Sequence, residues 1–523
     1  MYLFHDTLVS FAERWDIKMR NSIIDRFEEI VKEKKEEIAV EHNAENITFD
    51  NLWRESVSVA NTIIKQTQII NKPIAVYLPK DISTIIADLG IIYSGNPFMN
   101  LDIKTPMDRI ENIIKQIKPA VIITNSIFKD KFKDLNIIVI DIMSVKENIQ
   151  VKNINVVRKN IIDTDPFCII NTSGSTGTPK GVVLNHRSFF DFVDWASEEF
   201  NFNGSEVIGS LSPAVFDIFD FELCMLIMKG SRMVLLDSNL ASFPMKLLSV
   251  LDEANVNFIF WVPSIMVNIA NMDLLTRIPL KSLKTVWFAG EVFPTKQFLY
   301  WYDNLPNVKF TNLYGPIEIT LDCTYYTVQK RPDEIQPLPI GVPCKNTDIL
   351  ILNEKNELCE IDEEGELCVR GTSLAMGYYN DTEKTSKAFV QNPLNNSYYE
   401  LIYRTGDMVV KDANGLIHFK GRKDTLIKHM GYRIELGEIE HLVVNDLKLV
   451  SYCCALYNNE EKIIVLYYES KEEIEPKEFR KKLSERIPTY MIPKQFKKID
   501  LLPRNTNGKI DRLQLKNLIN KKG

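Results

Sequence analysis

The feature that most constrains the fold is an alternation of short apolar runs with amphipathic stretches, which continues to about residue 339. Each apolar run has the length of a strand, and the stretches between them have the period of a helix. Strands covered by helices on both faces are apolar throughout, which is typical of buried, largely parallel sheets. The predicted strands are 72–79, 120–125, 136–142, 232–237 and 256–263, and the predicted helices are 22–37, 82–94 and 244–254.

A different texture follows from about residue 339, where "TDILILN", "GELCVRG" and "GLIHFKG" read as short strands between turns. This pattern predicts a compact β region. The last part of the chain mixes a helix near 435–446, strands near 449–457 and 461–469, and a helix near 476–487. We therefore expect an α/β protein with a large N-terminal domain over 1–423, made of parallel-rich sheets plus the β region, and a small mobile α+β C-terminal domain over 424–523.

Composition excludes several classes of protein. A net charge of -7 and a pI near 5.7 argue against a nucleic-acid-binding protein, which needs a concentrated basic field. The eight cysteines form no CxxC pair and the six histidines show no ligand spacing, which favours reduced thiols without structural zinc. The start of the chain lacks a signal-peptide pattern and no apolar run is long enough to span a membrane, so we expect a cytoplasmic protein without a membrane partner.

The loop "NTSGSTGTPKG" at 171–181 follows the apolar run 166–170. A strand that ends in a turn rich in glycine and hydroxyl groups leaves backbone N–H groups pointing outward, which suits a chain of phosphates. The loop is not a standard P-loop, because Lys180 follows Pro179 instead of a glycine. Taken alone, it also fits a plain surface loop.

Six motifs in a fixed order decide between these interpretations. They are "TSGSTGTPKG" (172–181), "NLYGPIEIT" (312–320), "GELCVRG" (365–371), "YRTGD" (403–407), "GRKDTLIKHMGYRIELGEIE" (421–440) and "LPRNTNGKIDR" (502–512). Together they resemble the adenylate-forming superfamily, which includes acyl-CoA synthetases, luciferases and the adenylation domains of nonribosomal peptide synthetases. The resemblance covers about 47–515. It is closest to free-standing amino-acid ligases such as D-alanine:carrier-protein ligases, through "FAGEVFP" (288–294) and "GYRIELGEIE" (431–440).

The resemblance implies a two-step reaction. A carboxylate attacks the α-phosphate of ATP to give an acyl adenylate and pyrophosphate, and a thiol then takes the acyl group. The implied nucleotide-binding residues are Thr172, Ser173, Gly174, Ser175, Thr176, Gly177, Lys180, Asn312, Tyr314, Gly315, Asp407, Arg422 and Lys509.

Individual roles follow from the same resemblance. Tyr314 would stack on adenine, Asp407 would accept the ribose hydroxyls with Arg422 nearby, and Glu318 would hold Mg²⁺. Ile317 departs from the family, because it stands where a threonine usually meets the α-phosphate; we expect the loss of one hydrogen bond, about 1 kcal/mol.

Two residues of the small domain also receive roles from the resemblance. Lys509 would reach the carboxylate and the α-phosphate during adenylation, so that Lys509, Glu318 and Lys180 form the implied catalytic set. Asp424 occupies the hinge position, about which the small domain would turn to remove Lys509 and present a new face for the thiol step. A surface turn is the alternative interpretation of Asp424.

The acid is expected to be an α-amino acid. Asp217 falls where amino-acid-activating members place an aspartate that pairs with the substrate ammonium, and such a pairing gives a physical reason for an acid between Phe216 and Ile218. An exposed turn is the alternative. By similarity to peptide-synthetase domains, the substrate pocket would be lined by Asp217, Ile218, Phe221, Phe260, Trp287, Ala289, Leu313, Leu321 and Asp322.

The walls of the predicted pocket bear on the size of the substrate side chain. Bulky walls and one polar group, Asp322, favour a small substrate such as serine. If Asp322 instead faces a lysine or a water, alanine of either hand, glycine or proline would fit, and a deeper pocket would admit a basic side chain.

The second substrate is expected to be the phosphopantetheine thiol of a separate carrier protein, because no segment of the chain resembles a carrier domain. The cations of 424–433 would suit an acidic carrier. An acyl- or aryl-CoA ligase of the same fold stays open as an alternative, as does a noncatalytic binding module, which the presence of Lys180, Glu318, Asp407 and Lys509 disfavours.

Overall fold

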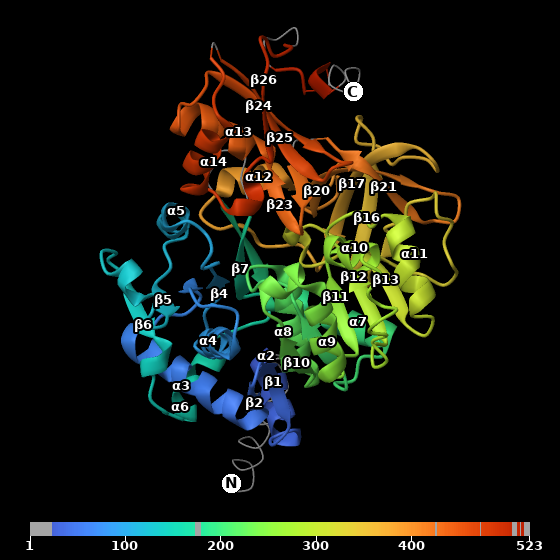
Figure 1. Cartoon of the computed structure of the whole chain (residues 1–523). Coiled ribbons are helices and arrows are strands. Elements are labelled where there is room, and N and C mark those ends of the chain that lie inside the picture. The colour runs from blue at the N-terminus through green and yellow to red at the C-terminus, as the bar shows by residue number, and fades with distance from the viewer. Residues whose placement is uncertain are drawn as a thin grey trace, which may run out of the picture.

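Two sheets of mainly parallel strands form the body of the molecule (Figure 1). The computed structural model describes residues 23–172, 179–423, 426–470, 472–504, 510–512 and 514–516. In spatial order, the first sheet contains β15 (Val342–Pro343), β14 (Thr324–Thr327), β13 (Lys309–Tyr314), β12 (Thr285–Phe288), β11 (Phe258–Trp261), β9 (Val207–Ser210), β10 (Arg232–Leu235), β1 (Ile38–His42) and β2 (Glu45–Thr48). The second contains β18 (Gly377–Tyr378), β8 (Lys180–Asn185), β7 (Pro166–Thr172), β4 (Phe98–Asn100), β3 (Ile74–Val76), β5 (Val121–Thr124) and β6 (Ile138–Asp141).

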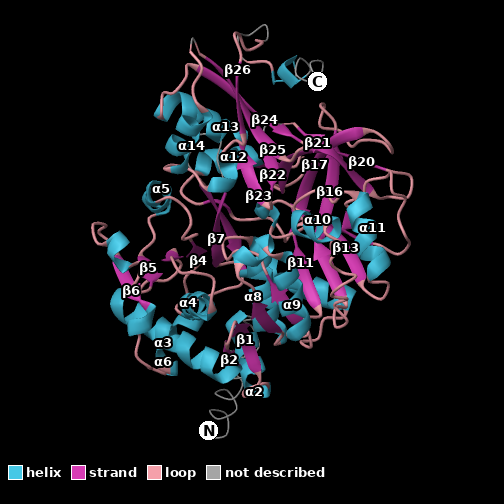
Figure 2. Cartoon of the chain, viewed as in Figure 1, coloured by secondary structure: helices cyan, strands magenta, loops and turns pink. Residues whose placement is uncertain are grey.

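The central strands of both sheets are parallel and buried, as their apolar sequences require. β5 and β11 are buried at every position, and only the outer strands β2, β8, β14, β15 and β18 pair antiparallel. Helices cover the faces (Figure 2). They are α2 (Ile23–Glu33), α3 (Phe49–Thr67), α4 (Ile82–Tyr93), α5 (Met107–Ile117), α6 (Val151–Arg158), α7 (His186–Phe200), α8 (Asp217–Lys229), α9 (Pro244–Glu253), α10 (Pro263–Asn271) and α11 (Thr295–Asn304).

Helix α8 is the element that most directly positions the site. Its residues from Phe219 to Met228 are all buried, and apart from the acids Asp220 and Glu222 they are apolar, as is typical of a helix in a core. It ends at Gly230, whose φ of 72° is the left-handed conformation that a helix C-terminus favours. Its first residue, Asp217, is thereby fixed near the carboxyl ends of the strands.

The β region and the small domain follow in sequence. The β region is a sheet of β16 (Thr347–Leu352), β17 (Glu364–Gly371), β20 (Leu401–Lys411), β19 (Phe389–Gln391) and β21 (Ile417–Arg422), with α12 (Thr382–Ala388) beside it. The small domain holds the hairpin β22 (Leu426–His429) and β23 (Tyr432–Glu435), then α13 (Leu436–His441), β24 (Tyr452–Asn458), β25 (Ile463–Glu469), α14 (Pro476–Ser484) and β26 (Gln495–Lys498). It has its own core around Ile439, Leu466 and Phe479.

The predicted α/β class with a large and a smaller part is confirmed, and the elements differ from expectation mainly at their ends. The helix expected over 22–37 ends at Glu33, and the second half of the helix expected over 435–446 is a π-helix, Leu442–Asp446. The boundary at residue 423 stays a prediction, and Asp424 lies outside the described residues. Within the described ranges, every helix is too short or too polar to cross a bilayer.

Candidate active site

The predicted site residues gather where strands of the sheets end. Tyr314 is the last residue of β13, Thr172 is the last of β7, and Asp217 is the first of α8. In open α/β sheets, ligands bind beyond the carboxyl ends of the strands. The topology therefore brings together Thr172 and Tyr314, which are 142 residues apart in the sequence (314 minus 172), with Asp217 between them in chain order.

Asp217 is a half-buried carboxylate at the start of α8. Its Oδ1 accepts the backbone N–H of Ile218 at 3.0 Å. Loss of water around the carboxyl raises its pKa to about 6, and the nearby positive charge of Lys428 acts in the opposite direction. Lys428 lies on β22, so this positive charge comes from the small domain and not from the domain that holds Asp217.

Asp322 is buried, and an unusual stretch of backbone places it. Thr320 and Leu321 both have left-handed φ values, 52° and 66°, which residues with a Cβ rarely adopt. Burial raises the pKa of Asp322 well above its usual value; the charge of Asp217 raises it further, and Lys428 lowers it. The charge of Lys428 acts on Asp322 while its Nζ donates to Gly315 O, so the choice between serine and the alternatives stays a prediction.

The aromatic walls of the predicted pocket form one cluster. Trp287 stacks on Phe221 with ring centroids 5.2 Å apart and meets Phe260 edge-on at 5.5 Å, and all three are fully buried. Trp287 Nε1 has no hydrogen-bond partner among the described residues. The other predicted lining residues are the buried Ala289, Leu313 and Leu321 and the half-buried Ile218.

The predicted adenine and ribose residues are in direct contact. The Tyr314 hydroxyl donates to Asp407 Oδ2, and Arg422 Nη1 donates to Asp407 Oδ1. Gly315 follows in a turn where a Cβ would lie 2.2 Å from the carbonyl oxygen of Leu321, so no side chain fits. Asn312 donates its side-chain amide to Pro339 O at 2.8 Å and thus holds the neighbouring chain.

Glu318 lies in the turn after β13 and is fully buried. Its Oε1 accepts the Tyr378 hydroxyl at 2.8 Å and lies 3.6 Å from Lys180 Nζ, while its Oε2 accepts Arg433 Nη1 at 2.5 Å. Burial alone would raise the pKa of Glu318, but Arg433 and Lys180 outweigh it and lower that pKa to about 2. The carboxylate is therefore ionised and fully neutralised by cations of the protein.

The carboxylate type at Glu318 fits Mg²⁺, but the arrangement around it does not. A hard oxygen ligand that works together with phosphates is the usual way proteins hold this ion. Here both Glu318 oxygens are taken by donors, and among the described residues no three His, Cys, Asp or Glu side chains are grouped to hold a metal. Glu318 would be able to bind Mg²⁺ through Oε2 only if Arg433 no longer occupied that oxygen.

The hairpin β22–β23 brings small-domain residues into the site. Lys428 Nζ donates to Gly315 O at 3.4 Å and lies 5.7 Å from the centre of the Tyr314 ring. The Gly431 N–H donates to Glu291 Oε1 at 3.0 Å, and Glu291 Oε2 caps α10 through Ser264 N. The expectation that the cations of 424–433 face a carrier is wrong for Lys428 and Arg433, which point inward to acceptors of the large domain.

Several predicted residues lie outside the described part of the chain. They are Ser173, Gly174, Ser175, Thr176, Gly177, Asp424 and Lys509. The residues on either side of 505–509 belong to the small domain: Arg504 pairs with Glu469, and Ile510 packs beside Leu515 against β24 and β25. This layer lies at the far end of the small domain from α8 (Figure 1).

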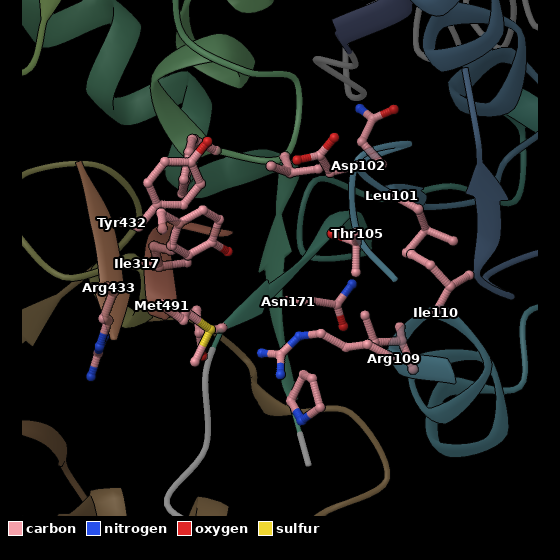
Figure 3. Close-up of a pocket in the computed structure, with 17 residues that line it drawn as sticks. Leu101, Asp102, Thr105, Arg109, Ile110, Asn171, Ile317, Tyr432, Arg433 and Met491 are labelled. Atoms are coloured by element: carbon pink, nitrogen blue, oxygen red, sulfur yellow. The ribbon is translucent and has the colours of Figure 1, made fainter. Parts of the chain in front are cut away.

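A cavity of about 80 Å³ separates the two domains beside the site. Figure 3 shows Thr105 and Arg109 of the large domain on one side of it and Tyr432 and Met491 of the small domain on the other. Ligand pockets usually measure roughly 300 to 1,000 Å³. The cavity is therefore smaller than a typical ligand pocket, and Phe216, the neighbour of Asp217, lines it.

The comparisons with known proteins agree with this arrangement. Residues 27–379 match the family model described as AMP-binding enzyme. The chain is 29% identical to zwittermicin A synthase ZmaJ of Bacillus cereus over 93% of each chain, and it also matches much longer relatives, of which it spans as little as 8%.

Solved structures share the fold. The adenylation domain AlmE of Vibrio cholerae, in complex with glycyl-adenosine-5'-phosphate, has a TM-score of 0.81 at 19% identity and covers 96% of this chain and 99% of its own. An artificially fused adenylation-PCP di-domain NRPS, NpsA-ThdA from Klebsiella oxytoca, has a TM-score of 0.79 at 20% identity, with 96% and 97% covered. The predicted resemblance is confirmed: the chain belongs to the AMP-binding enzyme family, and it is an adenylate-forming ligase that uses ATP.

Proposed function

We propose that this protein activates a small α-amino acid with ATP and Mg²⁺ as an aminoacyl adenylate, releases pyrophosphate, and transfers the aminoacyl group to the phosphopantetheine thiol of a carrier protein on another chain. The observation that carries the proposal is the position of Asp217. Its half-buried carboxylate has a raised pKa, and the cation whose charge lowers that pKa is Lys428 of the small domain. When the small domain turns away, an ammonium group of a substrate would replace that cation.

The relatives support the choice of an amino acid. AlmE was crystallised with a glycyl adenylate, which is an activated amino acid with the smallest side chain. In this chain the fully buried cluster of Phe221, Phe260 and Trp287 leaves little room beyond the backbone of a substrate. Serine is the proposed side chain if Asp322 is free to accept its hydroxyl, and alanine or glycine if Lys428 keeps that carboxylate occupied.

The orientation of the small domain supports a separate thiol step. The hairpin β22–β23 lies in the site, whereas the residues that flank Lys509 lie in the outer layer of the small domain. We assign this orientation to thiol transfer and the opposite one, with Lys509 at the site, to adenylation. The cavity between the domains is lined from both sides in this orientation, and we propose that a thiol arm enters the site there.

The test is an ATP–pyrophosphate exchange screen over the twenty amino acids, D-alanine, and fatty and aromatic acids. We expect exchange with one or a few small amino acids and none with fatty or aromatic acids. Asp217→Ala should reduce exchange with every amino acid by roughly a hundredfold or more, because the ammonium loses its partner. Exchange that depends on an aromatic or fatty acid would replace the proposal with the acyl- or aryl-CoA ligase alternative.

A second variant tests the side chain. Asp322→Ala removes the acceptor for a side-chain hydroxyl, so it should lower the ratio of kcat/KM for serine over alanine by roughly tenfold to a hundredfold. If the wild type prefers alanine or glycine and Asp322→Ala leaves the ratio unchanged, the serine assignment fails while the amino-acid assignment stands.

A further inference from the structure

We propose that Arg433 and Mg²⁺ compete for the Glu318 carboxylate, so that the small domain docks in the orientation seen here only when the metal is absent from that carboxylate. The proposal rests on the proposed use of Mg²⁺ with ATP. It adds a rule for the order of events: Mg²⁺, which serves adenylation, would have to leave Glu318 before the small domain docks for thiol transfer.

The first argument is the occupancy of Glu318. A fully buried carboxylate requires a compensating cation, and Arg433 supplies one through a charge-assisted hydrogen bond to Oε2. Oε1 is already shared by Tyr378 and Lys180. A divalent cation bound to Oε2 would stand within a few ångströms of the guanidinium, and like charges at that distance repel strongly away from bulk water. The two cations therefore exclude each other.

The second argument is that Arg433 cannot withdraw alone. It lies on β23, one residue after Tyr432. The centre of the Tyr432 ring lies 5.0 Å from that of Phe216 in the large domain and 3.5 Å from that of Tyr490, on which it stacks. At the hairpin tip, Gly431 is held by its N–H donation to Glu291. Loss of the Arg433 contact is thus coupled to undocking of the hairpin, and metal at Glu318 would favour the undocked small domain.

The chain offers a matched control contact. Arg109 on α5 pairs with the buried Glu438 on α13, and this pair also joins the large and small domains. Arg109 does not contact Glu318, the carboxylate to which the metal is assigned. Arg109→Ala should therefore loosen docking without changing the competition, whereas Arg433→Ala should abolish the competition itself.

The experiment fixes the docked orientation by a covalent link and then measures metal binding. Asp108 and Arg486 form an exposed ion pair across the same interface at 2.9 Å. Cysteines at these two positions, in a Cys359→Ser background, can be joined by a short bis-maleimide, since the other seven native cysteines are buried. The affinity for Mn²⁺ with the nonhydrolysable α,β-methylene-ATP is then measured by water-proton relaxation, before and after linking.

Competition predicts a distinct set of affinities. Linking should weaken Mn²⁺ binding by roughly tenfold or more in the wild-type background and in Arg109→Ala. In the linked Arg433→Ala and Arg433→Gln proteins, Mn²⁺ should bind about as tightly as in their unlinked forms. The glutamine variant keeps a hydrogen-bond donor, so it separates the effect of charge from the effect of lost packing.

Two outcomes would overturn the inference. One is equal Mn²⁺ affinity in the linked and unlinked wild-type background. The other is weak binding in the linked Arg433 variants, which would mean that docking excludes the metal by another route. Absence of Mn²⁺ binding in every form, linked or not, would instead contradict the proposed use of metal with ATP.

Discussion

At the scale of single residues, the site is built from carboxylates whose surroundings oppose their charge unless a cation is present. Asp217 and Asp322 both have pKa values raised by burial; the charge of Asp217 raises the pKa of Asp322 further, and Lys428 lowers both. Glu318 shows the opposite behaviour because Arg433 and Lys180 are close. Sites that must accept a positively charged substrate group gain selectivity from such unsatisfied carboxylates.

The first prediction concerns the pH dependence of amino-acid use. With Lys428 beside it the pKa of Asp217 is about 6, and the departure of Lys428 would raise it further, so the ionised form proposed to pair with an ammonium is lost as the pH falls below 6. For wild type, kcat/KM in pyrophosphate exchange should fall about tenfold per pH unit below pH 6. Asp217→Asn should be much less active and nearly independent of pH between 5 and 7.

Stability gives an independent check on the same residue. The pKa of Asp217 is raised on folding, from about 3.8 to about 6, so the folded state binds more protons in this window and loses stability as the pH rises through it. Asparagine does not ionise, so Asp217→Asn removes this loss of stability with rising pH. The variant should therefore have a higher Tm than wild type at pH 7 and a similar Tm at pH 4. A lower Tm for the variant at both pH values would contradict the assigned pKa.

At the scale of elements, the hairpin β22–β23 is the segment on which the arrangement depends. Gly431 at its tip has φ of +81°, and a Cβ there would lie 2.8 Å from Val262 Cγ1. Gly431→Ala should therefore prevent close docking and slow transfer from a chemically supplied aminoacyl adenylate to a carrier thiol by roughly tenfold or more. Pyrophosphate exchange should stay within about threefold, because adenylation is assigned to the other orientation.

Gly415 provides the matched control for this second prediction. Its φ of +82° imposes the same backbone strain, but the nearest atom to an added Cβ is 4.0 Å away. Gly415→Ala should lower stability like Gly431→Ala and leave both half-reactions unchanged. Adding Val262→Ala to Gly431→Ala should restore part of the transfer rate. Equal effects of the two glycine variants on transfer would show that contact with Val262 is not important.

Local sequence patterns predict the elements well and the contacts between them poorly. The buried parallel strands and their covering helices follow from apolar runs such as 256–263, which contains β11. The resemblance also assigned Tyr314 and Asp407 to one nucleotide site, and their side chains are in contact. The inward direction of Lys428 and Arg433 could not be predicted, since their partners Gly315 and Glu318 are more than a hundred residues away.

Backbone conformation was the second unpredictable feature. Thr320 and Leu321 adopt left-handed φ values without glycine or asparagine in the sequence to signal them. Such strain costs on the order of 1 to 3 kcal/mol for each residue and persists only where the surrounding structure fixes it. Here it sets the direction in which Asp322 enters the site. The only local sign of this turn in the sequence is the motif 312–320, at whose end it lies.

At the scale of the whole molecule, function depends on how the small domain is held against the large one. The interface combines a contact at the site, Arg433 with Glu318, and a contact remote from it, Arg109 with Glu438. The remote pair is nearly dry, since its side chains are only 11% and 1% exposed. A buried pair of this kind adds little net stability when both partners are present, but removal of one partner leaves an uncompensated charge.

The last prediction follows from that asymmetry. The Arg109–Glu438 pair exists only in the docked orientation, so Arg109→Ala destabilises that orientation alone. It should shift the molecule toward undocking and slow carrier transfer by roughly tenfold to a hundredfold, with exchange unchanged or faster. The exposed pair Arg486 and Asp108 lies on the same helix α5 side of the interface, and Arg486→Ala should change transfer by less than about threefold. The double variant Arg109→Met with Glu438→Gln removes both charges, so it should recover much of the transfer rate lost by Arg109→Ala. Transfer and exchange rates from rapid quench would decide the matter: if Arg109→Ala slows both half-reactions equally, the pair supports the fold of the protein and does not select an orientation of the small domain.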